Sequence, residues 1–325
     1  MAVQDSALQP ELESGRPSAL FRAANAARNG LALILRTNTG RVAFAIVLVH
    51  LIVAIIGPSI TPYKPTTYDL DYRFGAPNAE HWLGTDDKGR DVLSRVLAGS
   101  RSIVIIATLG TILGVTLGTI VGVTSGYFGG KTDQIIMRFV DWFLAIPSLL
   151  LAILVINMSR QWFTYLDLDE LWLVKILTIG ISFEAWLVIF TIGISFMPNN
   201  SRVIRSAALA IKPLEFVQSA RLRGEPTIYI MFREILPNVL PVVAVEAAIR
   251  LSFALLLTAG LGFLGLGVQP PSSDWGLMVS ENFRHIGQVP LAALAPGLAM
   301  ASLVVGINLL ADGIRQAQNL PETGE

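Results

Sequence analysis

The sequence predicts an all-α integral membrane protein with six transmembrane helices. Of its 325 residues, 53% are hydrophobic and only 15% are charged, which is too apolar for a soluble domain of ordinary composition. Six apolar blocks each approach the roughly 20 residues that a helix needs to cross the hydrocarbon core of a bilayer. We place these spans at about 42–60, 102–126, 134–157, 172–197, 238–262 and 289–311.

Two segments precede the first span. Residues 1–17 carry Gln, Ser, Glu and two prolines, so we expect a disordered cytoplasmic tail there. Residues 18–40 place apolar side chains such as Leu20 and Leu31 among arginines such as Arg22. This pattern predicts an amphipathic elbow helix that lies on the cytoplasmic surface of the membrane. The first transmembrane helix then occupies 41–60.

The distribution of Lys and Arg indicates the orientation. Five arginines precede the first span, and the fourth connection holds Arg202, Arg205, Lys212, Arg221, Arg223 and Arg233. The third and fifth connections each hold one Arg and are outnumbered by acidic residues. Since positive charge stays on the cytoplasmic side, we expect both termini, including the tail 314–325, to be cytoplasmic. The connection 61–99 then lies outside.

The composition also excludes several functions. The formal net charge is +0, so no net field recruits nucleic acid. No cysteine is present, which excludes disulfide scaffolds and thiolate metal sites. The three histidines are not spaced as a cluster, and no H-E-x-x-H or G-x-S-x-G motif occurs. We therefore expect no catalytic residue, no cofactor and no metal site in this chain.

The polar segment 212–238 separates the fourth and fifth spans. Pro213 favours the start of a helix, and Gly224 favours its end in the left-handed conformation. Pro226 would open a second short helix before Pro237. Two short helices hinged at Gly224 would form a compact knob beside the membrane.

This segment resembles the EAA loop of ABC-importer permeases. The resemblance rests on Glu215-x-x-Gln218-Ser219-Ala220, on Gly224 and on Ile235-Leu236-Pro237. In that family the loop is a coupling helix that docks into a groove of the ATPase subunit. The chain departs from the motif at Gln218 and Ser219, which replace the Glu and the first Ala. An ordinary amphipathic cytoplasmic loop is the alternative interpretation.

The resemblance also implies roles for individual residues. Gln218, Ala220, Arg221 and Gly224, together with Glu215, would belong to the ATPase contact. The apolar side chains would fill the groove of the ATPase, and these are Phe216, Val217 and Leu222.

A second resemblance lies in the first connection. Residues 82–95 read W-L-G-T-D-x-x-G-R-D-x-x-S-R, which is similar to the C-type permease subunits of dipeptide, oligopeptide and nickel importers. A third is G-F-L-G-L-G-V-Q-P-P at 262–271, followed by Trp275-Gly276. Asp91 is placed to cap a short amphipathic surface helix that begins at Val92. Metal binding by His81, Asp86, Asp87 and Asp91 is the alternative to solvated surface carboxylates, which we favour.

The second span carries a regular glycine pattern. Glycine recurs every four residues from Gly110 to Gly126, so the five glycines share one helix face. In membranes such stripes let backbones approach closely. We expect a packing seam, filled by a helix of this chain or of a second permease. The phosphate-loop-like S-G-Y-F-G-G-K-T at 125–132 and the G-x-G-x-x-G at 260–265 follow no β-strand, so we assign neither to a nucleotide.

Several ionisable residues fall within the predicted spans. Asp141 lies in the third span, Lys175 and Glu184 in the fourth, and Glu246 and Arg250 in the fifth. Charges in a membrane are costly, and residues four apart on a helix can pair. These residues line the translocation pathway or form a buried pair that anchors packing.

Together the three motifs identify the chain as resembling a type I ABC-importer transmembrane domain (MetI-like). This implies a five-helix transmembrane domain over 100–313 with a coupling loop at 198–237. It also implies a bacterial inner membrane, a second homologous permease subunit, two ATPase subunits that bind ATP and Mg, and an extracytoplasmic binding protein. Peptides are the favoured cargo. Nickel or another small solute, or a non-ABC secondary transporter, are the alternatives.

Overall fold

The computed structural model describes residues 35–166 and 182–319 of the chain, and these residues form helices without any β-strand. The expected disordered tail 1–17 and most of the expected elbow helix lie outside the described residues. So do residues 167–181, where we placed the start of the fourth span, and the last residues of the expected tail 314–325. Its first residues continue the last helix.

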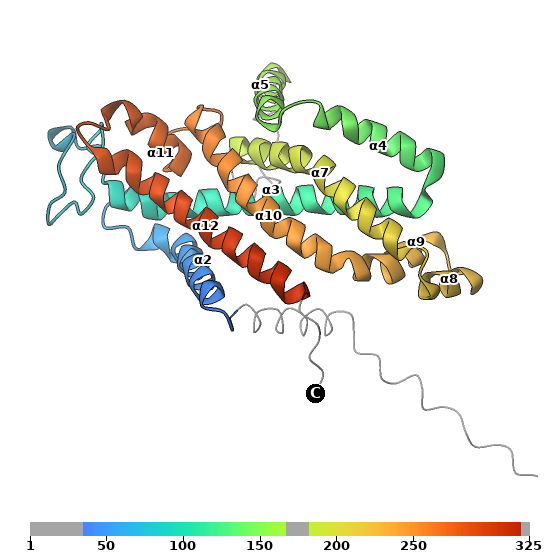
Figure 1. Ribbon diagram of the computed structural model, residues 1–325. Coiled ribbons are helices and arrows are strands. Elements are labelled where there is room, and N and C mark those ends of the chain that lie inside the picture. Colours follow the sequence, from blue (N-terminus) through green and yellow to red (C-terminus); the bar gives the residue numbers. More distant parts are fainter. Residues whose placement is uncertain (1–34, 167–181, 320–325) are drawn as a thin grey trace, which may run out of the picture.

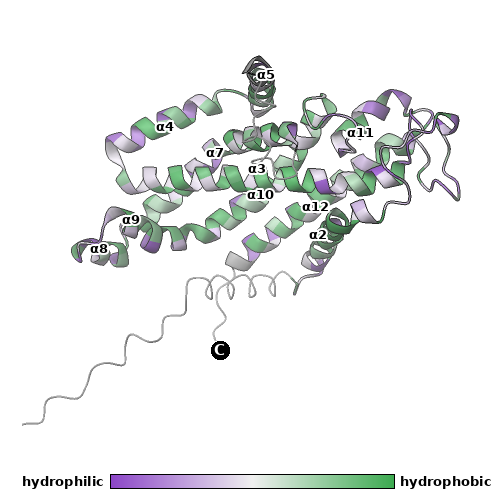
Figure 2. Ribbon diagram, turned by 180° about the vertical axis from the view of Figure 1, so that it is seen from behind, coloured by the Kyte–Doolittle hydropathy of each residue, from purple (hydrophilic) through white to green (hydrophobic). Residues whose placement is uncertain are grey.

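Five described helices are long and apolar enough to cross a membrane. Their apolar composition confirms an all-α membrane fold. These helices are α2 (Asn38–Ile56), α3 (Val92–Phe128), α7 (Phe183–Ile211), α10 (Leu236–Phe263) and α12 (Pro290–Asn319). Short helical segments lengthen two of these spans, α2 to Ser59 and α10 back to Thr227. In Figure 2 hydrophobic residues run along the lengths of these helices.

The third predicted span is not one straight helix. It is divided into α4 (Gly130–Leu144) and α5 (Ser148–Leu166), which meet at an angle of 85°. Pro147 lies directly before α5. Proline removes an amide donor and disfavours helix geometry in the preceding residue, so the chain breaks here. Figure 1 shows α5 turned away from α4. If this pair counts as one broken span, the described part has the six spans that the sequence predicts.

Helices α3 and α7 form the centre of the fold, and the glycine stripe is their seam. A Cβ atom added at Gly114 would lie 2.9 Å from the carbonyl oxygen of Gly193, and one at Gly122 would lie 2.6 Å from that of Ser201. Side chains at these positions would push the two backbones apart. The predicted packing seam is therefore confirmed, and a helix of this chain fills it.

Helices α3 and α7 also extend beyond their predicted limits. The expected short surface helix near Val92 is instead the first part of α3, capped by Asp91, whose Oδ2 accepts a 2.7 Å hydrogen bond from the Ser94 amide. Helix α7 continues to Ile211, so the expected coupling loop 198–237 begins with helix. Contact with α3 sustains this helix, since Asn200 donates a 2.9 Å hydrogen bond to the Val115 carbonyl.

The two ends of α3 carry different structures. The short helix α11 (Trp275–Asn282) packs beside its first turns, and the short helix α8 (Glu215–Leu222) lies near its last turns. Figure 1 shows α11 and α8 at opposite ends of the bundle. We call these the α11 end and the α8 end.

Candidate functional site

At the α8 end, Gly224 ends the first short helix in the left-handed conformation, as the sequence predicts. Gly224 has φ +77° and follows α8. The Gly224 amide donates to the Arg221 carbonyl at 2.9 Å, and the Glu225 amide donates to the Ala220 carbonyl at 3.2 Å. This pair of hydrogen bonds is the glycine-ended helix stop. The predicted end of the first short helix is confirmed.

The second short helix is different from the prediction. Pro226 caps α9 (Thr227–Tyr229), which runs through a π-helical segment, η4 (Ile230–Ile235), directly into α10. The segment is therefore the start of the long helix and not a separate unit. Pro237 lacks an amide donor, and the wider π turns lie directly before it.

Two residues anchor α8 to the bundle. Val217 and Ala220 have exposed fractions of 0% and share a buried cluster with residues of α7 and η4 such as Ile204, Ala208 and Ile230. Their spacing of three residues places both on one helix face. The expectation that Val217 fills a partner's groove and that Ala220 contacts the ATPase is thus corrected. They face inward and fix the helix in place.

The opposite face of α8 is open. Glu215, Phe216, Gln218, Leu222 and Gly224 are exposed, and Leu222 is 89% exposed. We call these five residues the coupling surface. Gln218 donates a long 3.4 Å hydrogen bond to the Lys212 carbonyl. An apolar side chain as exposed as Leu222 is free to contact a partner.

Arg221 does not join that surface. Its guanidinium carbon lies 5.1 Å from the ring centroid of Tyr127, near the end of α3. Its Nε is buried and has no hydrogen-bond partner among the described residues. The residue therefore faces the bundle, in contrast to the contact role that the resemblance implies.

Of the ionisable residues in the spans, Lys175 lies outside the described residues, and the four candidate pathway or packing residues fall into different places. Glu246 and Arg250 form an ion pair of 3.0 Å along α10, with side chains 11% and 17% exposed. Asp141 instead pairs with Arg202 of α7. Glu184 lies in the first turn of α7 and makes no ion pair with any other described residue. The structure thus joins two of the four and leaves the others apart.

Sequence reasoning missed a charged pocket between α4 and α7. Asp133 forms an ion pair with Arg205 and accepts a hydrogen bond from Ser125. Asp133 and Arg205, together with Asp141 and Arg202, line an open pocket of about 390 Å³. Asp133 and Asp141 are eight residues apart and so fall within one broad stripe of the helix, and this spacing was a signal for such a face.

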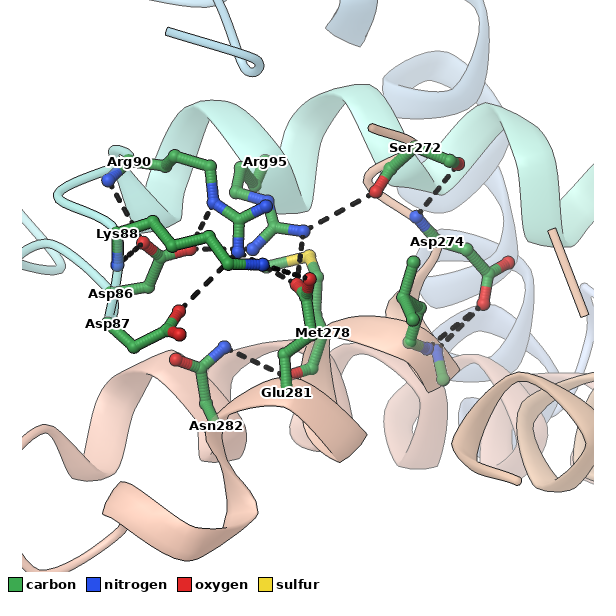
Figure 3. Close-up of polar contacts among 12 residues, drawn as sticks. Asp86, Asp87, Lys88, Arg90, Arg95, Ser272, Asp274, Met278, Glu281 and Asn282 are labelled. Atoms are coloured by element: carbon green, nitrogen blue, oxygen red, sulfur yellow. Dashed lines mark hydrogen bonds and ion pairs between the residues drawn. The ribbon is translucent and has the colours of Figure 1, made fainter. Parts of the chain in front are cut away.

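At the α11 end, buried ion pairs replace the expected solvated carboxylates. Asp86 is 1% exposed and accepts from Arg90 at 2.7 Å and from Arg95 at 2.6 Å. Glu281 of α11 binds both arginines at 2.8 and 2.9 Å and Lys88 at 2.9 Å. Figure 3 shows these side chains converging from the first connection, α3 and α11. The arginines compensate the buried carboxylates, which is why they need not be solvated.

The third motif, 262–271 followed by Trp275-Gly276, also lies at the α11 end, where its residues have a packing role. Trp275 donates a 2.9 Å hydrogen bond to the Val96 carbonyl, and a Cβ on Gly99 would lie 1.9 Å from the Ser273 carbonyl oxygen. Gly276 approaches the Ala259 carbonyl of α10 similarly. These residues therefore pack α11 against α3 and α10. No group of His, Asp and Glu that could hold a metal ion occurs in the described part of the chain.

Comparison with known proteins decides the family. Residues 114–319 match the family described as binding-protein-dependent transport system inner membrane component. The chain belongs to this family. The match spans more than half of the sequence and includes α7, α8 and α10, so the resemblance to importer permeases is confirmed.

Curated relatives cover nearly the whole chain. It is 31% identical over 322 residues to the dipeptide transport system permease protein DppC of Alkalihalophilus pseudofirmus, covering 95% of each chain. It is 35% identical over 283 residues to the glutathione transport system permease protein GsiD of Escherichia coli, covering 87% of this chain and 86% of that one.

A solved structure supports the fold. The chain resembles an inward-facing conformation of the MetNI methionine ABC transporter with a TM-score of 0.52 and 19% identity. The likeness covers 69% of this chain and 96% of the other. The expected type I, MetI-like transmembrane fold is therefore confirmed.

Proposed function

We propose that this chain is a permease subunit of an ATP-driven importer, and that it forms half of a pathway for di- or oligopeptides delivered by a substrate-binding protein. The observation that carries the proposal is the coupling surface on a helix anchored to the spans, in a chain of this family. The relatives named for dipeptide and glutathione transport favour a peptide as the cargo.

The geometry suits the transfer of force from a partner. Leu222 and Phe216 offer apolar side chains to a groove, and Gln218 offers a neutral hydrogen-bonding group. Because Val217 and Ala220 are fully buried against the bundle, a displacement of α8 moves the spans and not the loop alone. ATP and Mg would bind to two separate ATPase subunits. Closure of these subunits would bring two coupling helices together and turn the translocation pathway between the two permeases from inward-facing to outward-facing.

The partners and orientation follow from the same reasoning. A second, homologous permease would complete the pathway in the bacterial inner membrane. The α8 end and both termini would lie in the cytoplasm, because Lys212, Arg221, Arg223 and Arg233 surround α8. The α11 end would then meet the binding protein outside.

Cysteine labelling tests this orientation, since the chain has no cysteine of its own. Ser219 at the α8 end and Glu80 at the α11 end are both exposed. In intact cells an impermeant maleimide should label Glu80→Cys and leave Ser219→Cys unlabelled until the membrane is opened. The reverse pattern would contradict the orientation.

Transport itself is tested in proteoliposomes that contain both permeases, the ATPase subunits and the binding protein. We expect the ATPase subunits to copurify with this chain. Uptake of radiolabelled di- and tripeptides should require ATP and stop with vanadate, while nickel is not accumulated. Uptake that follows an ion gradient and ignores ATP would reject the proposal.

A further inference from the structure

Arg221 occupies an unusual position for a residue of a docking helix. It lies in the last turn of α8, next to the exposed Leu222, yet its guanidinium turns back over the face of Tyr127 at 5.1 Å. Its Nε is buried without a hydrogen-bond partner among the described residues. A buried donor left unpaired is unfavourable, whereas the attraction between the cation and the ring face stabilises the guanidinium in this position.

Tyr127 places this contact on the central helix. It lies in the last turn of α3 and packs against the same buried cluster that holds Val217 and Ala220. Helix α3 has 37 residues, and at 1.5 Å per residue it reaches about 55 Å. Its other end carries Arg95, which is bound to Glu281 of α11.

A long, continuous helix that is held at both ends behaves as a rod. The glycine seam packs it closely on α7, and tight packing transmits displacement instead of absorbing it. A push on the ring of Tyr127 would therefore move α3 and, through Arg95 and Glu281, the α11 end.

We propose that Arg221 is a positioning residue that transmits the displacement of α8 to α3 through the ring of Tyr127, and that it does not bind the ATPase. This inference rests on the proposed function as an importer. The inference assigns two roles to the residues of α8. The coupling surface contacts the ATPase subunit, while Arg221 transmits the movement of α8 to α3.

The test removes each side of the contact with a side chain that keeps the packing. Arg221→Met retains an unbranched apolar stem without the cation, and Tyr127→Met fills the cluster without a ring. The complete complex is reconstituted with each variant, and the peptide carried per ATP hydrolysed is measured. Each variant should lower this ratio about two- to tenfold, as expected for couplings of this kind. The ATPase subunits should still copurify in normal amounts.

Further variants separate a specific contact from general damage. The double variant should lower the ratio no further than the more impaired single variant does, since both substitutions remove the same interaction. Tyr127→Phe keeps the ring and should keep the ratio, and Arg221→Lys should restore part of it. The matched control, Arg223→Gln, changes an exposed arginine two residues from Arg221 that lies outside the Arg221–Tyr127 contact, and it should leave the ratio unchanged.

Several outcomes would overturn the inference. If Arg221→Met released the ATPase subunits while Tyr127→Met did not, Arg221 would be a docking contact. An unchanged ratio in Arg221→Met, or additive losses in the double variant, would also reject it. If the wild-type complex showed no ATP-dependent peptide uptake, the proposed function would fail and the inference with it. If the wild-type complex carries peptide and only the variants show a lower ratio or none, the result tests the role of Arg221 and not the proposed function.

Discussion

Arg95 and Glu281 form an ion pair of 2.9 Å, although 186 residues separate them in the sequence. Glu281 also binds Lys88 and Arg90, so one carboxylate of α11 meets three cations of the first connection and α3. This arrangement is visible in Figure 3. It clamps the two halves of the chain together at the α11 end.

Removing the charge of Glu281 should destabilise this end. Glu281→Gln leaves Arg90 and Arg95, which are 1% and 0% exposed, without part of their compensation. Breaking a buried pair in this way costs about 3–5 kcal/mol. Thermal unfolding of the purified permease should show a clear loss, whereas the exposed Glu80→Gln should unfold like the wild type. An unchanged midpoint in Glu281→Gln would contradict the prediction.

The pH dependence of stability provides a second check on the same group. Burial alone raises the pKa of Glu281, but the charges of Arg95, Lys88 and Arg90 outweigh it and lower this pKa to about 2. Because the folded pKa lies below the ordinary 4.5, the stabilisation is complete above pH 4.5 and is lost as the pH falls toward 2. The difference between the wild type and Glu281→Gln should shrink across this window. A constant difference would contradict the assignment.

The pKa of Asp274 is shifted in the opposite direction from that of Glu281, so we expect a substitution that removes its charge to stabilise the protein. Burial raises its pKa to about 6, against hydrogen bonds from the Leu277 and Gly276 amides, which lower it. Its Oδ2 has no hydrogen-bond partner in the described part of the chain. An acid whose folded pKa is raised loses stability as the pH climbs from its ordinary 3.8 to about 6. At neutral pH the carboxylate therefore costs stability.

Asp274→Asn should raise the unfolding free energy at pH 7 by about 1–3 kcal/mol. The amide keeps an oxygen for the helix cap and removes the buried charge. The gain should narrow toward pH 4, where the native carboxyl is protonated. Asp69→Asn is the matched control, because Asp69 caps a short helix while exposed to solvent. A destabilised Asp274→Asn protein at pH 7 would show that the charge is required.

The features that sequence reasoning predicted are local ones. The glycine seam and the helix stop at Gly224 depend on residues within a few turns, so spacing was sufficient. The inward turn of Val217 depends on which face of α8 meets α7, and the motif alone does not contain that information. The pairing of Asp141 with Arg202 joins two helices whose register sequence spacing does not fix. Burial of Asp86 depends likewise on Arg95, across a turn.

A methyl group in the glycine seam should be costly. In Gly122→Ala the Cβ would lie 2.6 Å from the Ser201 carbonyl oxygen, and backbone cannot turn aside as a side chain can. Overpacking of this kind costs about 1–3 kcal/mol. The control is Gly260→Ala in α10, where a Cβ meets no atom within 4 Å. It should be neutral or slightly stabilising. Thermal unfolding of both variants measures the contrast, and equal effects would argue against a tight seam.

The pair of Glu246 and Arg250 should act in packing. Glu246→Gln leaves Arg250, 17% exposed, without its countercharge, which costs about 1–3 kcal/mol. The abundance of the complex should fall. The double variant with Arg250→Gln should restore abundance and peptide uptake together, because the pair neutralises itself along one helix. If abundance recovers while uptake remains lost, the residues line the pathway instead.

The helix stop at Gly224 predicts an order among substitutions. A Cβ at this position meets no atom within 4 Å, so Gly224→Ala bears only the left-handed strain of φ +77°, about 1–2 kcal/mol. Asn adopts this conformation more easily and should be better tolerated. Gly224→Pro fixes a negative φ and removes the amide that donates to Arg221 at 2.9 Å. It should remain in the membrane while hydrolysing ATP without carrying peptide.

Strain at a distant glycine provides the control for this series. Gly265 also has a positive φ, +73°, and open space at its Cβ, but it follows α10 near the α11 end. Gly265→Ala should therefore lose a similar amount of stability and keep the peptide carried per ATP, whereas Gly224→Ala should lower that ratio. If the two variants changed the ratio equally, the effect would come from general strain. Full transport by Gly224→Pro would exclude a coupling role for the turn altogether.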